Sequence, residues 1–255
     1  MPSFASYPSL EGRTIFVSGG GSGIGAGIVE HFAGQGAKVG FVDVDEAASA
    51  ALVEAIRGKG HLAPSFLKCD VRDTKAYQAA IGAIAAKLGP VTVLVNNAAR
   101  DDRHTLDEVT EAFWDERMAV NLRHHYFAIQ AVAPGMRKAG GGSIVNLSSM
   151  SYVAMTRNLS VYQAAKAAVI GMTRGLARDL GGDNIRVNSV MPGWIMTERQ
   201  IKLWLTPESE AALMTQQCLR EKLYPADIAR MILWLAADDS RLVTAQNFVV
   251  DGGRN

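Results

Sequence analysis

Seven short apolar segments alternate with longer amphipathic segments along this chain, and that alternation restricts its fold more than any other feature. The apolar segments have strand length and lack strict polar–apolar alternation, which is typical of parallel strands buried on both faces. Parallel strands joined through helices form right-handed crossovers. The sequence therefore predicts an α/β fold with a doubly wound, seven-stranded parallel sheet and helices on both faces. The expected strands cover residues 13–18, 37–43, 65–70, 92–97, 141–149, 184–193 and 247–253.

Helical patterns separate these strands. The longest predicted helix covers about 106–138, with Pro134 as a candidate for a break. Another helix carries Tyr162, and a helical insertion follows the sixth strand at about 197–219. Because no linker, repeat or low-complexity segment divides the chain, we expect a single domain over residues 1–255. The remaining helices are expected from about residue 24 and over 45–60, 73–89 and 225–239.

The composition argues against several classes of protein. The 255 residues are 48% hydrophobic and 20% charged, which is enough for a sizeable core. With 26 basic and 25 acidic residues and no long basic run, we expect neither nucleic acid nor an anionic membrane as partner. Cys69 and Cys218 lie too far apart to suggest a disulfide framework or a zinc site. No signal-peptide pattern and no apolar run near the about 18 residues of a membrane span occur, so we expect a cytoplasmic protein.

The segment SGGGSGIG, residues 18–25, follows the first strand and opens a helix. Its glycines permit positive φ angles and let phosphate oxygens approach the backbone. The start of the helix offers free N–H groups and a partial positive charge to a pyrophosphate. The spacing of Gly19, Gly23 and Gly25 is a variant of GxGxxG, and in its strand–loop–helix context it indicates a dinucleotide site.

Asp43 ends the second strand, 18 residues after Gly25. An acid at this position can bind both ribose hydroxyls of an adenosine and repels a 2′-phosphate. Its neighbours Val44, Asp45 and Glu46 supply no cation for that phosphate. The alternative, a cap of the next helix, suits Asp45 better than Asp43. The sequence therefore predicts NAD rather than NADP.

Two later segments carry polar residues that need a reason. In VYQAAKAAV, residues 161–169, Tyr162 and Lys166 share one helix face. Taken alone, such a pair is more often a ring at the core edge beside a solvated cation. Ser149 ends the fifth strand 13 residues before Tyr162, so both can face one crevice, although serines at a strand end are also routine helix caps. Asn121 lies inside the predicted 106–138 helix, where asparagine is unfavourable. It can stabilise a kink, bind a water or have no particular role.

The loops after the fourth and sixth strands are also candidates for cofactor contacts. The small residues of NNAA, which include Asn97 and Ala98, would let a ribose lie against the backbone, unless they form only a strand-end turn. In MPGWIMT, residues 191–197, Pro192 and Gly193 turn the chain. Thr197 can meet a cofactor carboxamide or merely cap a helix.

In their order and spacing, SGGGSGIG, Asp43, CDV at 69–71, NNAA, Asn121, Ser149, YQAAK and PGWIMT closely resemble the short-chain dehydrogenase/reductase family over essentially the whole chain. Ser18 stands where a threonine is commonest and keeps the hydroxyl, and Ala99 stands where a glycine is commonest and narrows the loop slightly. The resemblance implies a Rossmann fold that binds NAD. The residues that it assigns to the cofactor are Gly19, Ser22, Gly23, Ile24, Gly25, Asp43, Asp70, Val71, Asn97, Ala98, Tyr162, Lys166, Pro192, Gly193, Ile195 and Thr197.

The same resemblance implies a catalytic set of Asn121, Ser149, Tyr162 and Lys166. Tyr162 would be the base that removes the proton of an alcohol. Its pKa of about 10 is too high for neutral pH, and we expect Lys166, with the positive nicotinamide, to lower it. Lys166 would also donate to the nicotinamide ribose, Ser149 would hold the reacting oxygen, and Asn121 would keep a water in line with Lys166.

Within the family, the chain looks most like bacterial NAD-dependent aldose 1-dehydrogenases, through YPSLEG, NNAARDDRH, WDERMAVNLRHH, QAVAPGM, WIMTERQ and QCL. This implies oxidation of an aldose of the L-arabinose, D-xylose, D-galactose or L-fucose type at C1 to an aldonolactone. Expected sugar contacts are Ser149, Ser151, Asn158, Tyr162 and Trp194. We expect the insertion at about 194–218 to form a lid that excludes water.

Several alternatives remain open at this point. The cluster Asp101, Asp102, Arg103 and His104 can contact sugar hydroxyls or form ion pairs with Arg117 or Arg123. The substrate can instead be another secondary alcohol, such as a deoxy-keto-sugar acid or a 3-hydroxyacyl group. The third class is a non-catalytic NAD-binding regulator, against which the Ser149–Tyr162–Lys166 set argues.

Two further expectations concern the histidines and the assembly of the chain. The five histidines show no metal-ligand spacing, so no metal is expected. We expect His124 and His125 at the surface or at an interface. The 106–138 helix and the Tyr162 helix carry more apolar surface than one sheet face needs, and a homotetramer through these helices is expected from the resemblance.

Overall fold

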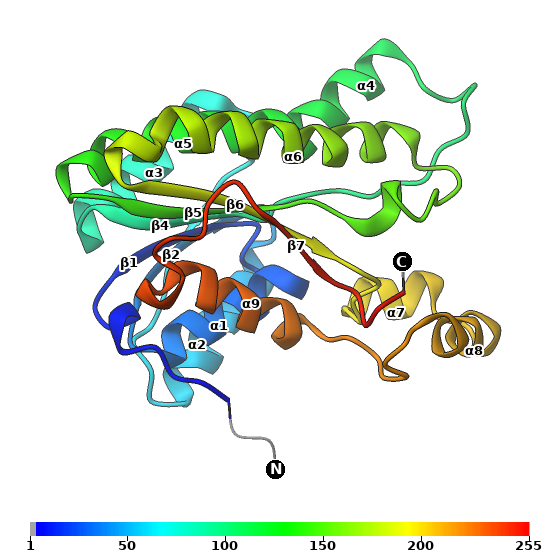
Figure 1. The fold of residues 1–255 in the computed structure, drawn as a ribbon, viewed down its shortest axis with the longest axis horizontal. Helices are drawn as coiled ribbons and strands as arrows, with labels where there is room; N and C mark the ends of the chain where they lie inside the picture. Colours follow the sequence, from blue (N-terminus) through cyan, green and yellow to red (C-terminus); the bar gives the residue numbers. More distant parts are fainter. Residues whose placement is uncertain (1–3, 255) are drawn as a thin grey trace.

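The sheet of the computed structural model, which describes residues 4–254, has seven strands in the order β3-β2-β1-β4-β5-β6-β7, and every neighbouring pair is parallel. The predicted doubly wound α/β fold is therefore confirmed (Figure 1). The strands begin and end within about three residues of the predicted limits. They are β1 (Thr14–Ser18), β2 (Lys38–Asp43), β3 (Ser65–Lys68), β4 (Val91–Asn96), β5 (Gly142–Leu147), β6 (Ile185–Pro192) and β7 (Asn247–Val250).

Helices cover both faces of this sheet (Figure 1). One face carries α1 (Gly23–Gly34), α2 (Glu46–Gly58) and α9 (Pro225–Ala236). The opposite face carries α3 (Thr74–Leu88), α4 (Glu111–Met118), α5 (His124–Lys138) and α6 (Ser160–Leu180). The predicted insertion forms two short helices, α7 (Glu198–Trp204) and α8 (Pro207–Gln216), which follow β6.

Each face of the sheet has its own apolar core. Phe32 of α1 and Ile232 of α9 are fully buried against one face, and Ile129 of α5 is buried against the other. The strand order reverses at β1. Strands β2 and β3 lie on one side of β1, and β4 to β7 lie on the other. A crevice opens at such a reversal outside the carboxyl ends of the strands, and this is where a doubly wound sheet binds its ligand.

The long helix predicted over 106–138 has a different construction. It begins at Glu111, where the Thr110 hydroxyl accepts the N–H of Phe113 at 3.1 Å. A π-helical turn, Ala119–Arg123, then separates α4 from α5. The predicted break at Pro134 is wrong, since α5 continues through this residue. Ala133 and Met136 on either side are buried, and this packing outweighs the one backbone bond that the proline cannot make.

The prediction of His124 and His125 at the surface or at an interface is also wrong, since both side chains are buried inside the single chain. The His124 ring meets the Tyr77 ring with centroids 5.9 Å apart, and its Nε2 hydrogen-bonds with the Ala98 carbonyl at 3.0 Å. The π-helical turn just before α5 adds residues to one turn and so changes which side chains face the sheet. Burial lowers the pKa of His124 to about 3, so this imidazole is neutral.

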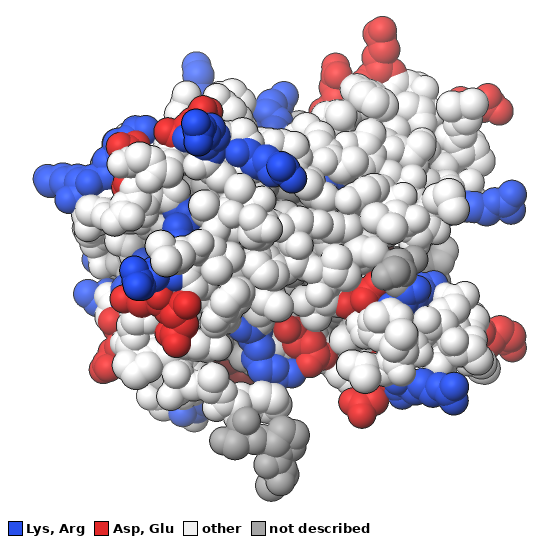
Figure 2. All heavy atoms as spheres, viewed as in Figure 1, with Lys and Arg blue, Asp and Glu red and all other residues white. Residues whose placement is uncertain are grey.

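Acidic and basic side chains are interspersed on the face of the molecule in Figure 2, in keeping with a net charge of +1. Among residues 4–254, no helix combines the length and the apolar character needed to cross a bilayer.

A glycine in β2 sets how closely α3 packs on the sheet. A Cβ at Gly40 would lie 2.3 Å from Cγ2 of Ile84 in α3. We expect Gly40→Ala to lower the free energy of unfolding by about 1–3 kcal/mol, because the core has no space for the methyl group. The midpoint of urea-induced unfolding measures this effect.

Two further variants check this explanation. Gly40→Ala should cost much less in an Ile84→Ala background, because the clashing side chain is then absent. Gly82→Ala is the control, since a Cβ there meets no atom within 4 Å and alanine favours the α3 helix. An equal loss from Gly40→Ala in both backgrounds would rule out the steric explanation.

Candidate functional site

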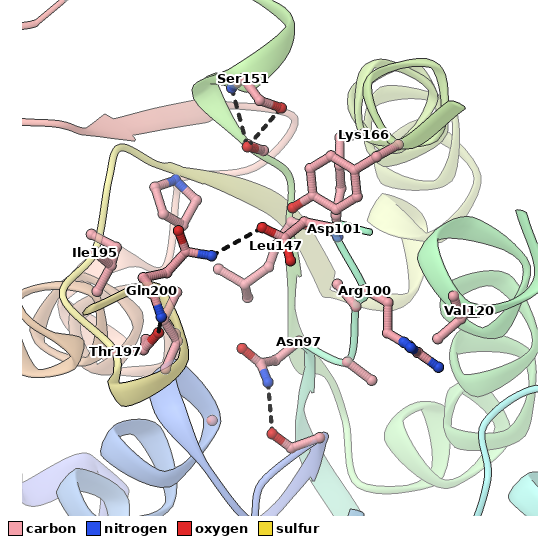
Figure 3. A pocket seen from close by; sticks show the side chains of 18 of the residues that line it. Asn97, Arg100, Asp101, Val120, Leu147, Ser151, Lys166, Ile195, Thr197 and Gln200 are labelled. Atoms are coloured by element: carbon pink, nitrogen blue, oxygen red, sulfur yellow. Dashed lines mark hydrogen bonds between the residues drawn. The ribbon is translucent and has the colours of Figure 1, made fainter. Parts of the chain in front are cut away.

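A cavity of about 640 Å³ lies at the carboxyl ends of the strands (Figure 3). This volume is in the range of ligand sites, roughly 300–1,000 Å³. Most predicted site residues line it, whereas Gly23, Asn121 and Asn158 do not. Those that do are Gly19, Ser22, Ile24, Gly25, Asp43, Asp70, Val71, Asn97, Ala98, Ser149, Ser151, Tyr162, Lys166, Pro192, Gly193, Trp194, Ile195 and Thr197.

The glycine-rich loop has the geometry that a diphosphate needs. Gly19 has φ +65°, and a Cβ at Gly25 would lie only 1.8 Å from the Gly19 carbonyl oxygen. Helix α1 begins at Gly23, and the Ser22 side chain at its N-cap accepts no capping hydrogen bond. The first N–H groups of α1 thus remain available beside cavity-lining backbone. The loop and the helix start fit the pyrophosphate of a dinucleotide.

Asp43 and Asp45 have separate tasks in the structure. The Asp45 carboxylate caps α2 by accepting the N–H of Ala48 at 3.0 Å. Asp43 instead accepts the N–H of Gly21 at 2.8 Å and so ties the end of β2 to the glycine-rich loop. The acid that caps α2 is therefore Asp45. Asp43 is free of this task and lines the cavity.

Asp70 and Val71 line the cavity after β3. Arg72, which the sequence analysis did not single out, also lines it and binds the Asp70 carboxylate through Nε at 2.9 Å and through Nη2. This hydrogen bond lowers the pKa of Asp70, with the nearby positive charges adding to the effect. The ion pair fixes the part of the cavity wall that follows β3 in the chain.

Hydrogen bonds join the loops after β1 and β4. The Asn97 side-chain amide donates to the carbonyls of Ser18 and Gly19 at 3.0 and 2.8 Å. In return, the Ser18 hydroxyl accepts the N–H groups of Asn97 and Ala98 at 3.0 and 3.1 Å. The hydroxyl that serine shares with threonine thus has a defined function at this position.

Tyr162 and Lys166 lie one turn apart on α6 and both line the cavity, as their spacing predicts. The Lys166 Nζ lies 5.7 Å from the centroid of the Tyr162 ring and donates to the Leu147 carbonyl at 2.8 Å. The Lys166 side chain is almost fully buried, and this desolvation lowers its pKa to about 7. The surface position that the alternative interpretation gave this lysine is therefore wrong.

The expected lowering of the Tyr162 pKa is not found in the protein alone. Burial raises the pKa of this phenol, and the negative charge of Asp101 raises it further. The Ser149 hydroxyl and the Arg103 guanidinium act in the opposite direction but do not prevail. The prediction counted the charges of Lys166 and of the nicotinamide, whereas in the protein alone the desolvation of both side chains acts against the first of these.

Ser149 and Asn121 make contacts within the protein. The Ser149 hydroxyl accepts the N–H of Ser151 at 3.1 Å, so it caps the short 3₁₀ turn Met150–Tyr152 while lining the cavity. Asn121 is buried in the π-helical turn and exchanges two hydrogen bonds with the Arg100 backbone at 2.9 and 3.1 Å. These bonds give the reason for an asparagine inside a helix.

The cluster after β4 forms the expected ion pairs with Arg117. The Asp102 carboxylate pairs with Arg117, with Arg100 at 3.0 Å and with Arg199 of α7 at 3.2 Å. Arg123 is not part of this network, since it donates to the Arg72 carbonyl at 2.9 Å. The neighbouring Asp101 and Arg103 side chains line the cavity instead.

Residues of the insertion reach this cluster. Gln200 of α7 donates to Asp101 at 2.9 Å (Figure 3). The side-chain carbonyl of Gln200 accepts the Trp194 indole N–H at 3.0 Å. Gln200 and Trp204 both line the cavity, and no pattern in the sequence marks either of them. The Thr197 hydroxyl caps α7 through the N–H of Gln200 at 3.2 Å, so the capping alternative applies while Thr197 also lines the cavity.

Asn158 is exposed outside the cavity at φ +58°, where its carbonyl accepts the N–H of His104 at 2.9 Å. The structure therefore gives no support to Asn158 as a sugar contact. In the described part of the chain, no three His, Cys, Asp or Glu residues are arranged to hold a metal ion.

Comparison with known proteins places this chain among dehydrogenases. Residues 19–255 match the sequence family described as "Enoyl-(Acyl carrier protein) reductase". The chain is 51% identical over 249 residues to a probable galactose dehydrogenase of Rhizobium meliloti (strain 1021), covering 98% of this chain and 97% of the relative. It is 48% identical over 251 residues to a D-xylose 1-dehydrogenase of Caulobacter vibrioides, covering 98% and 99%.

A solved structure has a very similar fold. The blue fluorescent protein from a metagenomic library, in complex with NADPH, superimposes with a TM-score of 0.87 at 37% identity, covering 96% of this chain and 99% of that protein.

The burial of Lys166 predicts a pH-dependent stability of the protein without ligand. Its pKa is about 7 in the folded chain and has the usual value of 10.5 in the unfolded chain. Between these two values the unfolded chain binds more protons, so folding becomes more favourable as the pH rises. We expect the stability of the wild type relative to Lys166→Met to increase from about pH 7 to about pH 10.5, measured as the difference in urea midpoint. A difference that does not change with pH would contradict the burial of a lysine that loses its charge.

Proposed function

Since the chain belongs to the short-chain dehydrogenase/reductase family, we propose that it oxidises an aldose at C1 to the aldonolactone, with NAD as hydride acceptor. The observation that carries this proposal is the convergence of Ser149, Tyr162 and Lys166 on the cavity that also contains the glycine-rich loop. The choice of a sugar as substrate is supported by the relatives named galactose dehydrogenase and D-xylose 1-dehydrogenase, at 51% and 48% identity.

NAD would be held by the residues that line the cavity around the glycine-rich loop. The N–H groups at the start of α1 would bind its pyrophosphate, and Asp43 would accept its adenosine ribose hydroxyls. The small side chain of Ala98 would leave room for the nicotinamide ribose. When bound, NAD accepts the hydride and brings the positive charge of its oxidised ring to the site.

Tyr162 would remove the proton of the sugar hydroxyl. Its raised pKa in the protein alone means that the phenol holds its proton until a positive charge lies beside it. Ser149 would donate a hydrogen bond to the reacting oxygen and hold it next to the phenol. Lys166, with its pKa near 7, can accept or release a proton at neutral pH, and we propose that it passes the proton toward solvent by way of a water held near Asn121.

We propose NAD in preference to NADP, although the solved relative holds NADPH. The Asp43 carboxylate would face a 2′-phosphate and repel it. Lys68, the cation aligned with Asp43 on the neighbouring strand β3, is engaged by Glu46 at 3.1 Å. Lys68 is therefore already paired and is not a free cation for that phosphate.

A panel of substrates tests the proposal directly. The wild type is mixed with NAD and with D-galactose, D-xylose, L-arabinose, L-fucose, a deoxy-keto-sugar acid or a 3-hydroxyacyl compound, and the absorbance of the reduced nicotinamide is followed. We expect oxidation of at least one aldose and no comparable oxidation of the two acids. NAD binding without turnover on any alcohol would favour the non-catalytic regulator.

The lid at about 194–218, the cytoplasmic location and the homotetramer remain predictions from the sequence. Trp114 of α4 and Tyr126 of α5 are 42% and 49% exposed, and such aromatic side chains would suit the proposed contact between subunits.

The preference for NAD should depend on Asp43. We expect Asp43→Ala to reduce the ratio of kcat/KM with NAD to that with NADP by at least ~10-fold, because a like charge facing the phosphate is removed. Steady-state kinetics with each cofactor measure the ratio. Asp45→Ala is the matched control, since it removes the α2 cap and should leave the ratio unchanged. A wild type that uses both cofactors equally well would refute the assignment of Asp43.

The role of Tyr162 as base has a sharp test in Tyr162→Phe. This variant keeps the ring and its packing and loses the titratable oxygen. We expect kcat to fall by at least ~10²–10⁴-fold, the usual loss for a general base, with little change in NAD affinity. Single-turnover kinetics and a binding titration measure the two effects. Tyr152→Phe is the control, because the Tyr152 hydroxyl only meets Met191 Sδ at 3.7 Å. A Tyr162→Phe enzyme with wild-type turnover would end this mechanism.

A further inference from the structure

Asp101 occupies an unusual position for a carboxylate on a surface loop. It follows β4 and lines the cavity, and its side chain is 22% exposed. The pKa of the Tyr162 phenol is raised first by burial and then by the negative charge of Asp101. Asp101 and Tyr162 line the same cavity, so a molecule bound there can meet both side chains.

Residues from across the cavity hold this carboxylate in place. One Asp101 oxygen accepts the Gln200 amide at 2.9 Å (Figure 3). The other oxygen lies 3.4 Å from the Arg199 guanidinium. Gln200 is itself fixed by the Trp194 indole at 3.0 Å. Asp101 is thus oriented by both the loop after β4 and helix α7, and its side chain has lost much of its freedom to turn away.

The hydrogen-bonding capacity of Asp101 is not exhausted by these contacts. An ionised carboxylate has about four acceptor positions on its two oxygens. Gln200 and Arg199 occupy one on each oxygen, so acceptor positions remain for a molecule in the cavity. A substrate hydroxyl that donates there forms a charge-assisted hydrogen bond, which is stronger than one between neutral groups.

The next residue, Asp102, is an acid with a purely structural set of contacts. Asp102 pairs with Arg100, Arg117 and Arg199 and is absent from the cavity lining. The two neighbours therefore differ in position and in contacts. Asp102 holds the loop to α4 and α7, whereas Asp101 faces the cavity.

We propose that Asp101, oriented by Gln200, determines specificity by accepting a hydrogen bond from the substrate hydroxyl on the carbon next to the one that is oxidised. This inference rests on the proposed function and specifies it further. The site selects substrates with two neighbouring hydroxyl groups, as in an aldose, over simple alcohols. The Asp101 charge also disfavours a substrate with an anionic group at that position.

Pairs of substrates that differ by one hydroxyl test this inference. The kcat/KM of D-galactose is divided by that of 2-deoxy-D-galactose for the wild type, Asp101→Asn and Asp101→Ala. We expect the wild type to favour the parent sugar by at least ~10-fold, and the ratio to approach one in Asp101→Ala. Asp101→Asn retains an acceptor for the Gln200 amide, so it separates the loss of charge from the loss of the contact with α7. Asp102→Asn is the matched control and should keep the wild-type ratio.

The pH dependence of kcat gives a second measurement that a structural role would not change. The charged or polar groups that face Tyr162 are Lys166 on α6, Ser149 after β5, and Asp101 and Arg103 after β4. Loss of the Asp101 charge lowers the Tyr162 pKa, so more of the phenol is ionised at a given pH. The rising limb of the profile for oxidation should therefore move to lower pH in Asp101→Asn and remain in place in Asp102→Asn.

The outcomes separate this inference from the proposed function. If the wild type oxidises no aldose, the proposed function is wrong, and the same ratio is measured with its fastest alcohol against the analogue that lacks the neighbouring hydroxyl. A ratio that is equal in the wild type and Asp101→Ala would overturn the inference in either case. A fastest alcohol without a neighbouring hydroxyl would overturn it as well.

Discussion

The cavity depends on the hydrogen bonds that Asn97 makes across the reversal of strand order between β1 and β4. Its amide binds the carbonyls of Ser18 and Gly19, and the Ser18 hydroxyl binds the backbone of Asn97 in return. These bonds fix the glycine-rich loop, which belongs to one half of the sheet, against the loop that begins the other half. They pair polar groups just beyond the ends of β1 and β4, where the hydrogen bonds of the sheet stop. The start of α1, the Asp43 carboxylate and the loop that carries Asp101 all take their positions from this junction.

Burial of charge is the second constraint, and it gives the site its chemical character. Lys166 loses most of its hydration, and the Leu147 carbonyl replaces only part of it, so the ammonium releases its proton near neutral pH. The same desolvation keeps the Tyr162 phenol protonated. Desolvation thus acts on the two neighbouring groups in the same sense, since it favours the neutral form of each.

The loop after β4 contains two neighbouring acids with separate tasks. Asp102 compensates the almost fully buried Arg117, whose charge would be costly to bury alone. Asp101 meets α7 through Gln200 and stays in contact with the cavity. Helix α7 is thus attached to the β4 loop by polar contacts and by the stacking of Arg103 on Trp204, with 5.0 Å from the guanidinium carbon to the ring centroid. Such contacts are easily exchanged with water, so this segment is held less firmly than the helices packed on the sheet.

The sequence by itself determined the doubly wound sheet, the nucleotide loop and the Tyr162–Lys166 pair, because each of these rests on local periodicity or on spacing within one element. Apolar runs mark buried strands, and residues four apart on a helix share a face whatever packs against them. Only the tertiary structure decided the burial of His124 and His125, the π-helical turn around Asn121, and the contact of Gln200 with Asp101. The direction of the Tyr162 pKa belongs to the same group, since desolvation depends on every segment that covers a side chain. Residues 101 and 200 lie 99 positions apart, and no local pattern records which distant segment will lie against a given loop.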